Sequence, residues 1–290
     1  MSAETPLDRV LALALIPELA DLHPDDLASL AERAEEPSFA EDACAVHFVL
    51  SGRVEVGSPR RPIAAPAIVG AVETLAGVAL PIRAVDTDTR VLSVERRALR
   101  WVMNDVFETR LAMLRHTAAR WLAAEDLEAE PRLDGEGSTR PLDWPVSLAS
   151  RILLLSDCEI FRSLRVHTLG RVASEMDELE LPAQSILWEP GARASHCYAI
   201  VDGELEVCAE PSAALTFEPG AVVGLRRVLA GGERTTRATS STRVRLLRLA
   251  GEALVDELED DPEMADAFLE ALADQTLRAE RASAERGQPS

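Results

Sequence analysis

The side chains best suited to chemistry in this sequence are scattered, and they form no catalytic motif. The GxGxxG, Walker, GxSxG and HExxH patterns are all missing from the 290 residues. His47 and His196 would suit a metal site inside a β-barrel, but they fall at different positions of the internal repeat described below, so no ligand cluster is expected. We therefore expect no enzymatic activity, no metal and no resident cofactor.

The arginines are the remaining candidates for binding. The pairs Arg60-Arg61 and Arg226-Arg227 are interpreted as solvated loop charges, because no aromatic platform or longer basic run accompanies them. Arg234 has two interpretations of about equal weight. It either binds an anion or forms an ordinary surface pair with Glu233 or another carboxylate.

The composition excludes several classes of partner. The formal net charge is -20 and 47% of the residues are hydrophobic, so the chain can build cores and repels phosphate. We expect no nucleic-acid partner and no membrane association. The four cysteines form no CxxC pair, and neither a signal peptide nor an apolar run of about 20 residues is evident. These features favour a cytoplasmic location.

The chain is predicted to consist of two β-rich domains joined by a linker. Residues 126–145 are rich in acid, glycine and proline, with no apolar period. Before this linker, residues 1–125 contain short strand-like runs and then a helical stripe over residues 98–122. Residues 146–290 repeat this order and end on a second helical stripe, which Pro262 can begin.

The two halves align by a growing offset. The offset is 142 residues at the opening helices, 151 at the first glycine turn, 154 at the second and 155 at the last strand, as shown by the pairs Ile16/Cys158, Gly52/Gly203, Gly70/Gly224 and Leu92/Leu247. The largest loss, nine residues (151 − 142), falls in the first copy before Gly52. A period of about 150 residues indicates duplicated domains, since solenoid units repeat every 20–50 or so.

The matching segments resemble the cyclic-nucleotide-binding domain family. They are IPELADLHPDDLASLA and CEIFRSLRVHTLGRVA, then VLSGRVEV and IVDGELEV, the PG turn before VVG, and the closing strands RVLSV and RLLRL. The resemblance implies a mainly β fold with flanking helices (α+β), here two tandem β jelly rolls. It also implies a regulatory, signalling role of the kind found in bacterial and kinase-associated relatives.

The resemblance also implies a ligand site in the second copy. Such a site holds a cyclic phosphate with backbone amides and an arginine, and a ribose hydroxyl with a carboxylate. Gly224 falls on the family's glycine, Arg234 on its phosphate-binding arginine, and Thr235 and Thr236 on the small residues that follow. Leu225 stands where the carboxylate belongs.

Two features weaken this expected site. Leu225 removes the ribose contact, and Glu233 replaces a proline and brings a negative charge near the phosphate position. In the first copy Ala71 replaces the carboxylate, and the arginine position falls near Ala79 or Ile82. Binding of cyclic AMP or cyclic GMP is therefore expected to be weak or absent.

Two functions follow from the sequence. One is a non-enzymatic regulator whose second domain senses a cyclic nucleotide or related small anion. The alternative is a ligand-free scaffold or protein-interaction module that retains the fold. In both, an unidentified protein partner is expected. We also expect a homodimer formed through the apolar stripe near residues 106–122.

Overall fold

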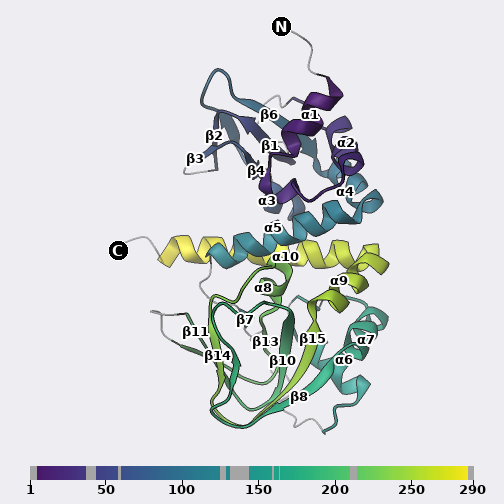
Figure 1. Ribbon diagram of the computed structural model, residues 1–290, viewed down its shortest axis with the longest axis vertical. Helices are drawn as coiled ribbons and strands as arrows, with labels where there is room; N and C mark the ends of the chain where they lie inside the picture. Colours follow the sequence, from purple (N-terminus) through teal and green to yellow (C-terminus); the bar gives the residue numbers. More distant parts are fainter. Residues whose placement is uncertain are drawn as a thin grey trace. The chain divides into compact units, whose positions relative to one another are not determined.

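The computed structural model describes residues 5–36, 44–57, 60–124, 129–130, 144–158, 160–162, 164–209 and 214–286 (Figure 1). The chain divides into two units, residues 1–117 and 118–290, with the division inside one helix. Most of the predicted linker 126–145 lies outside the described residues. The domain limits given above therefore stay a prediction.

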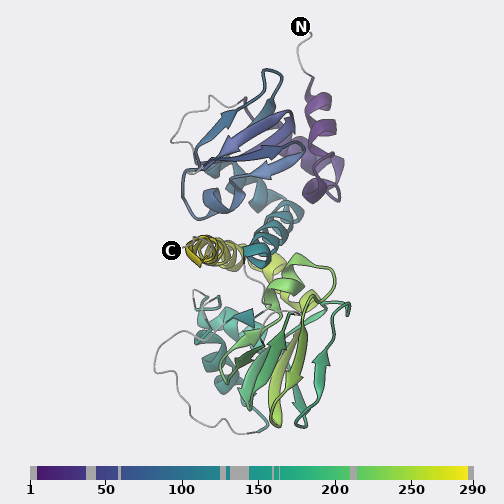
Figure 2. The same cartoon turned by 90° about the vertical axis from the view of Figure 1, so that its left-hand side faces the viewer.

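The second unit is a sandwich of two antiparallel sheets (Figure 2). One sheet has the order β7-β13-β10-β15-β8 and the other the order β12-β11-β14-β9. The strands are β7 (Ala129–Glu130), β8 (Asp177–Leu181), β9 (Ile186–Trp188), β10 (His196–Asp202), β11 (Leu205–Cys208), β12 (Leu215–Phe217), β13 (Val222–Val223), β14 (Arg237–Ser240) and β15 (Val244–Ala250).

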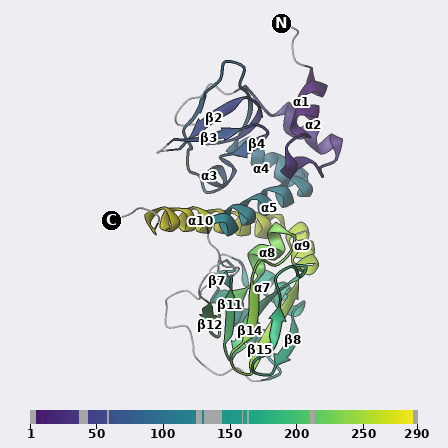
Figure 3. The same cartoon turned by 60° about the vertical axis from the view of Figure 1, so that its left-hand side comes forward.

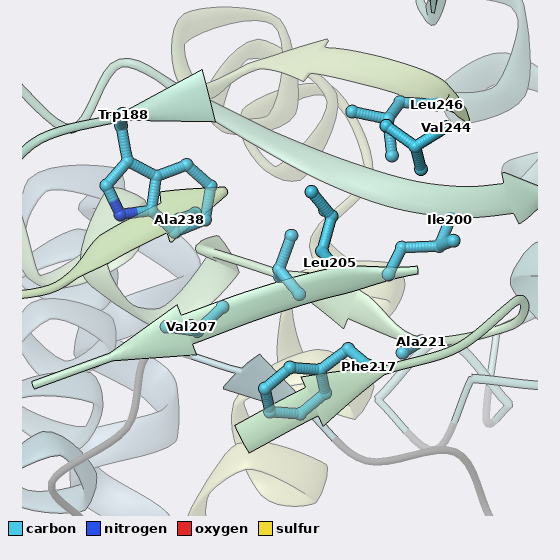
Figure 4. Packing of buried hydrophobic residues seen from close by; sticks show 10 residues of the cluster. Trp188, Ile200, Leu205, Val207, Phe217, Ala221, Ala238, Val244 and Leu246 are labelled. Atoms are coloured by element: carbon cyan, nitrogen blue, oxygen red, sulfur yellow. The ribbon is translucent and has the colours of Figure 1, made fainter. Parts of the chain in front are cut away.

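Alternating apolar residues of these strands build the core between the two sheets. Figure 4 shows Ile200 of β10 and Leu246 of β15 from one sheet, with Leu205 of β11 and Phe217 of β12 from the other. Trp188, at the end of β9, belongs to the same cluster and is only 6% exposed. The space between the two sheets, the interior of the jelly-roll barrel, is thus filled by the protein's own side chains.

The first unit repeats the central part of this sandwich. Its two sheets have the orders β4-β1-β6 and β3-β2-β5 and enclose a smaller aliphatic core that includes Val49, Val54 and Val91. The strands are β1 (Ala45–Ser51), β2 (Arg53–Val56), β3 (Arg61–Ala64), β4 (Ala67–Val69), β5 (Ile82–Ala84) and β6 (Arg90–Glu95).

Helices precede, interrupt and follow the strands in each unit. The predicted helix over residues 98–122 is two helices, because Val106 adopts an extended conformation (φ −131°, ψ 100°). Pro262 begins the last helix, as predicted. The helices are α1 (Pro6–Leu13), the 3-10 helix η1 (Pro17–Leu19), α2 (Pro24–Glu32), α3 (Ala71–Leu75), α4 (Arg96–Asp105), α5 (Phe107–Ala124), α6 (Leu148–Ser156), α7 (Val166–Ser174), α8 (Leu225–Ala230), α9 (Gly251–Asp260) and α10 (Pro262–Arg286).

The strand registers confirm that the two units are copies of one fold. His47 of β1 pairs with Val69, and Tyr198 of β10 pairs with Val223, which reproduces the offsets 151 (198 − 47) and 154 (223 − 69). The β1–β6 ladder shifts register between Val49 and Ser51, and the β10–β15 ladder shifts at the equivalent place. Side chains alternate between faces, so a shared register fixes which residues point inward.

A half-buried arginine contact is also repeated. Arg9 of α1 donates from Nη1 to the carbonyl of Ala34, and Arg151 of α6 donates from Nη1 to the carbonyl of Met176. Both members differ by 142 residues between the copies (151 − 9 and 176 − 34). In each unit, this hydrogen bond therefore links the opening helix to the segment just after the next helix.

The nine-residue loss falls in the part of the repeat that contains β8 and β9 in the second unit. Asp177 of β8 pairs with Arg248, and its counterpart Glu35 forms an isolated bridge with Ser93 (177 − 35 = 142; 248 − 93 = 155). Within the described residues, the first unit has this single bridge at the position where the second unit has β8. Residues 37–43 lie outside the described part.

We expect the substitution Gly203→Ala to lower the free energy of unfolding of the second unit by about 3 kcal/mol. Gly203 has φ +82°, and an added Cβ would overlap the carbonyl oxygen of Arg243. Gly191 is the matched control, since its φ is +84° but an added Cβ meets nothing within 4 Å. Gly191→Ala should cost only about 1 kcal/mol. Equal losses in urea unfolding would show that the overlap relaxes.

Candidate site around α8

The candidate site begins where β13 turns into α8. Gly224 is the N-cap of α8 and adopts the left-handed conformation, with φ 82°. A Cβ at this position would lie 2.5 Å from Nη1 of Arg234. Glycine is therefore needed here both for the backbone turn and for the close approach of the arginine. Figure 3 shows α8 beyond the ends of the strands of its own unit.

Arg234 is buried, not a surface arginine. Only 4% of the residue is exposed. Its Nη1 donates to the carbonyl of Gly224 at 3.2 Å, and its Nη2 donates to the carbonyl of His196. Its guanidinium also lies over the ring of Trp188, 4.3 Å from the ring centroid. The edge of the guanidinium thus donates hydrogen bonds to two backbone carbonyls, and its face packs on an aromatic ring.

Trp188 connects this arginine to the core of the barrel. Its ring stacks against Tyr198 at 5.8 Å between centroids, and its Nε1 donates to Oγ1 of Thr236 at 3.2 Å. Burial raises the pKa of Tyr198, so this phenol stays neutral. Burial also lowers the pKa of His196, with the nearby Arg248 and Arg234 as further causes.

The structure brings some of the predicted site residues together and separates others. Gly224 and Arg234 touch, whereas Leu225 is 1% exposed and belongs to the core. Thr236 is fully buried and accepts from Trp188, while Thr235 is exposed and accepts from Arg227. The exposed neighbour Glu233 takes part in an isolated backbone bridge with Arg193.

The sequence interpretation of Arg226 was wrong. It is not a solvated loop charge but a helical residue of α8 that is only 4% exposed. Its Nη2 donates to Oε1 of Gln275 in α10 at 2.6 Å, and its guanidinium lies 3.5 Å from the ring centroid of Trp121 in α5.

The first unit lacks the arginine at the equivalent position. Leu80 lies against Gly70 as Arg234 lies against Gly224, with the same offset of 154 (234 − 80 and 224 − 70). The predicted equivalents, Ala79 or Ile82, were therefore off by one or two residues. Burial lowers the pKa of the neighbouring His47 to about 4, so it is neutral near pH 7.

The described residues show no metal site and no membrane span. Nowhere among them do three or more His, Cys, Asp or Glu side chains gather in a way that would hold a metal ion. None of the helices in the described part is long and apolar enough to cross a bilayer.

Comparison with known proteins agrees with the geometry of the second unit. Residues 178–261 match the family model described as the cyclic nucleotide-binding domain. No protein of curated function matches the chain. Residues 178–261 of the second unit are therefore similar to the cyclic nucleotide-binding domain family, and the predicted β jelly-roll fold class is confirmed.

Several solved structures are similar to part of the chain. The N-terminal domain of a transcriptional regulator from Streptomyces coelicolor A3(2) is 25% identical over 44% of this chain and 96% of its own, with a TM-score of 0.42. A protein from Ruegeria pomeroyi described as cyclic nucleotide binding is 17% identical over 50% and 66%, with a TM-score of 0.41. The sensor domain of the transcriptional regulator DNR from Pseudomonas aeruginosa is 17% identical over 49% and 97%, with a TM-score of 0.41.

Proposed function

We propose that the chain is a non-enzymatic regulatory protein whose second domain keeps the cyclic-nucleotide-binding fold without needing a nucleotide, and acts as a protein-interaction module. The observation that carries this proposal is the engagement of Arg234. This buried guanidinium donates to the carbonyls of Gly224 and His196 and stacks on Trp188. An incoming phosphate would have to replace these contacts with others of similar strength, so little net binding energy remains.

The surroundings of Arg234 support the same proposal. Leu225, in the place of the ribose-binding carboxylate, is 1% exposed and offers no acceptor. Losing a hydrogen bond to a charged acceptor weakens binding by about ten- to a hundredfold. Trp188 and Phe217 belong to the core that fills the barrel. The site is thus closed by the protein's own residues.

One observation favours the second candidate function, a regulator that senses a small anion. Nη1 of Arg234 lies 3.2 Å from the carbonyl of Gly224, directly at the start of α8. A rotation of this side chain would present its charge at the turn where the family holds phosphate. Arg226 of α8 donates a hydrogen bond to Gln275 of α10. A movement of α8 would therefore also shift α10.

Calorimetry of the full chain with cyclic AMP, cyclic GMP and cyclic dinucleotides separates the two functions. The interaction module predicts no binding up to about 1 mM, and no gain for Leu225→Glu. The sensor predicts that Leu225→Glu improves affinity by about ten- to a hundredfold. Leu225→Met is the matched control because it keeps the volume without adding an acceptor. Circular dichroism of each variant checks that the domain is folded.

A further inference from the structure

Helix α1 presents apolar side chains on two faces. Leu13 and the following Ile16 are fully buried, as expected for the face that packs on its own unit. Leu7, Leu11 and Leu15 are 64%, 58% and 71% exposed. They recur at every fourth residue and so form one row along the helix and its C-terminal turn, which we call the leucine row.

The segment that carries the leucine row is acidic in sequence. Residues 5–36 contain eight Asp and Glu and two Arg, a net charge of −6 (2 − 8). Both arginines make contacts within the unit. Arg9 donates to the carbonyl of Ala34, and the guanidinium of Arg33 lies 3.5 Å from the ring centroid of Trp101. In contrast, Asp21 and Asp25 are exposed, and Asp26 is half-buried.

The equivalent face of the second unit combines different chemistry. Helix α6 also exposes leucines, Leu148 at 49% and Leu153 at 65%. The segment that follows it exposes Arg162 and Arg165 instead of a series of carboxylates. The combination of an apolar row with an acidic segment therefore belongs to α1 and not to its repeat.

We propose that the leucine row binds a basic amphipathic helix of a partner protein, which deepens the interaction-module function proposed above. Leucines spaced by four residues offer anchors for the apolar face of such a helix. Lysines and arginines flanking that face would meet the carboxylates of residues 5–36. A symmetric contact with a second copy would place this acidic surface against itself, which like-charge repulsion disfavours.

The test uses the full chain and a synthetic fluorescent peptide of leucine and lysine that places all its leucines on one helical face. Fluorescence anisotropy should show binding to the wild type. The triple variant Leu7→Ser, Leu11→Ser, Leu15→Ser should bind the peptide at least about tenfold more weakly. The double variant Leu148→Ser, Leu153→Ser is the matched control and should bind as the wild type does.

Five outcomes would overturn the proposal. Equal losses in the two variants, or no loss in the triple variant, would mean that the peptide is attracted only by the overall negative charge. Equal binding of a leucine–glutamate peptide would remove the charge argument. Light scattering that finds a wild-type dimer and a monomeric triple variant would assign the row to a second copy. Leucine-dependent binding to zwitterionic phosphatidylcholine vesicles would assign it to a membrane.

Peptide anisotropy and nucleotide calorimetry together keep this proposal separate from the proposed function. Binding of cyclic AMP by calorimetry, together with peptide binding that still depends on the leucine row, would reject only the ligand-free role of the second domain. Failure of the peptide arm, with no nucleotide binding, would reject only the leucine row as the docking surface.

Discussion

The substitution Arg234→Ala is expected to lower the free energy of unfolding of the second unit by about 4 kcal/mol. The side chain is buried, so solvent does not screen its contacts. Two hydrogen bonds from a charged donor contribute roughly 1.5–3 kcal/mol each, and the carbonyls of Gly224 and His196 would lose their partner. The ring of Trp188 would also lose the cation above it.

Urea unfolding, followed by circular dichroism and tryptophan fluorescence, measures this loss. Arg193→Ala is the control, because Arg193 is an exposed arginine of the same region and should change stability by less than about 0.5 kcal/mol. Arg234→Lys should recover less than half of the loss, since one ammonium cannot reproduce a planar fork stacked on indole. A loss below about 1 kcal/mol for Arg234→Ala would mean that Arg234 does not hold the site closed.

The second large effect is expected for Arg226→Ala, with a loss of about 3 kcal/mol. This substitution removes the hydrogen bond to Gln275 at 2.6 Å and the contact over Trp121 at 3.5 Å. Both contacts are buried, which strengthens them relative to contacts in water. Helix α8 should then loosen from α10, so its amide hydrogens should exchange faster than those of β10.

The neighbour Arg227 provides the matched control for this experiment. Its Nη2 donates to Oγ1 of Thr235 in an exposed setting, so Arg227→Ala should cost less than about 1 kcal/mol. Similar losses for the two arginines would contradict the assignment of Arg226 as the link between α8 and the helices. Hydrogen exchange that is unchanged in α8 of Arg226→Ala would contradict it as well.

The sequence determined the fold to a large extent, because aligning the two copies identifies equivalent turns and strands in each. The offsets at Gly52/Gly203 and Gly70/Gly224 predicted equivalent turns, and the β1–β6 and β10–β15 ladders confirm the equivalence. The position of the nine-residue loss was also predicted. Repeated local patterns survive in a single sequence because glycine turns and alternating apolar residues are dictated by backbone geometry.

The candidate site was predicted less completely. The sequence placed Gly224 and Arg234 in one cassette, and the structure brings them into contact. It missed Trp188, whose place at the end of a strand gave no sign that its ring lies under Arg234. It also misplaced the equivalent of Arg234 in the first copy, which is Leu80, because the loop before β5 differs in length between the copies.

The sequence by itself thus determined the two-copy organisation, the β-rich fold class and the residues that form the start of α8. Only the tertiary structure decided the environment of the charges. Arg226 and Arg234 are each 4% exposed because Trp121 and Trp188, which lie 105 (226 − 121) and 46 (234 − 188) residues away in the chain, fold over them. Burial and stacking depend on such long-range contacts, and no local pattern encodes them.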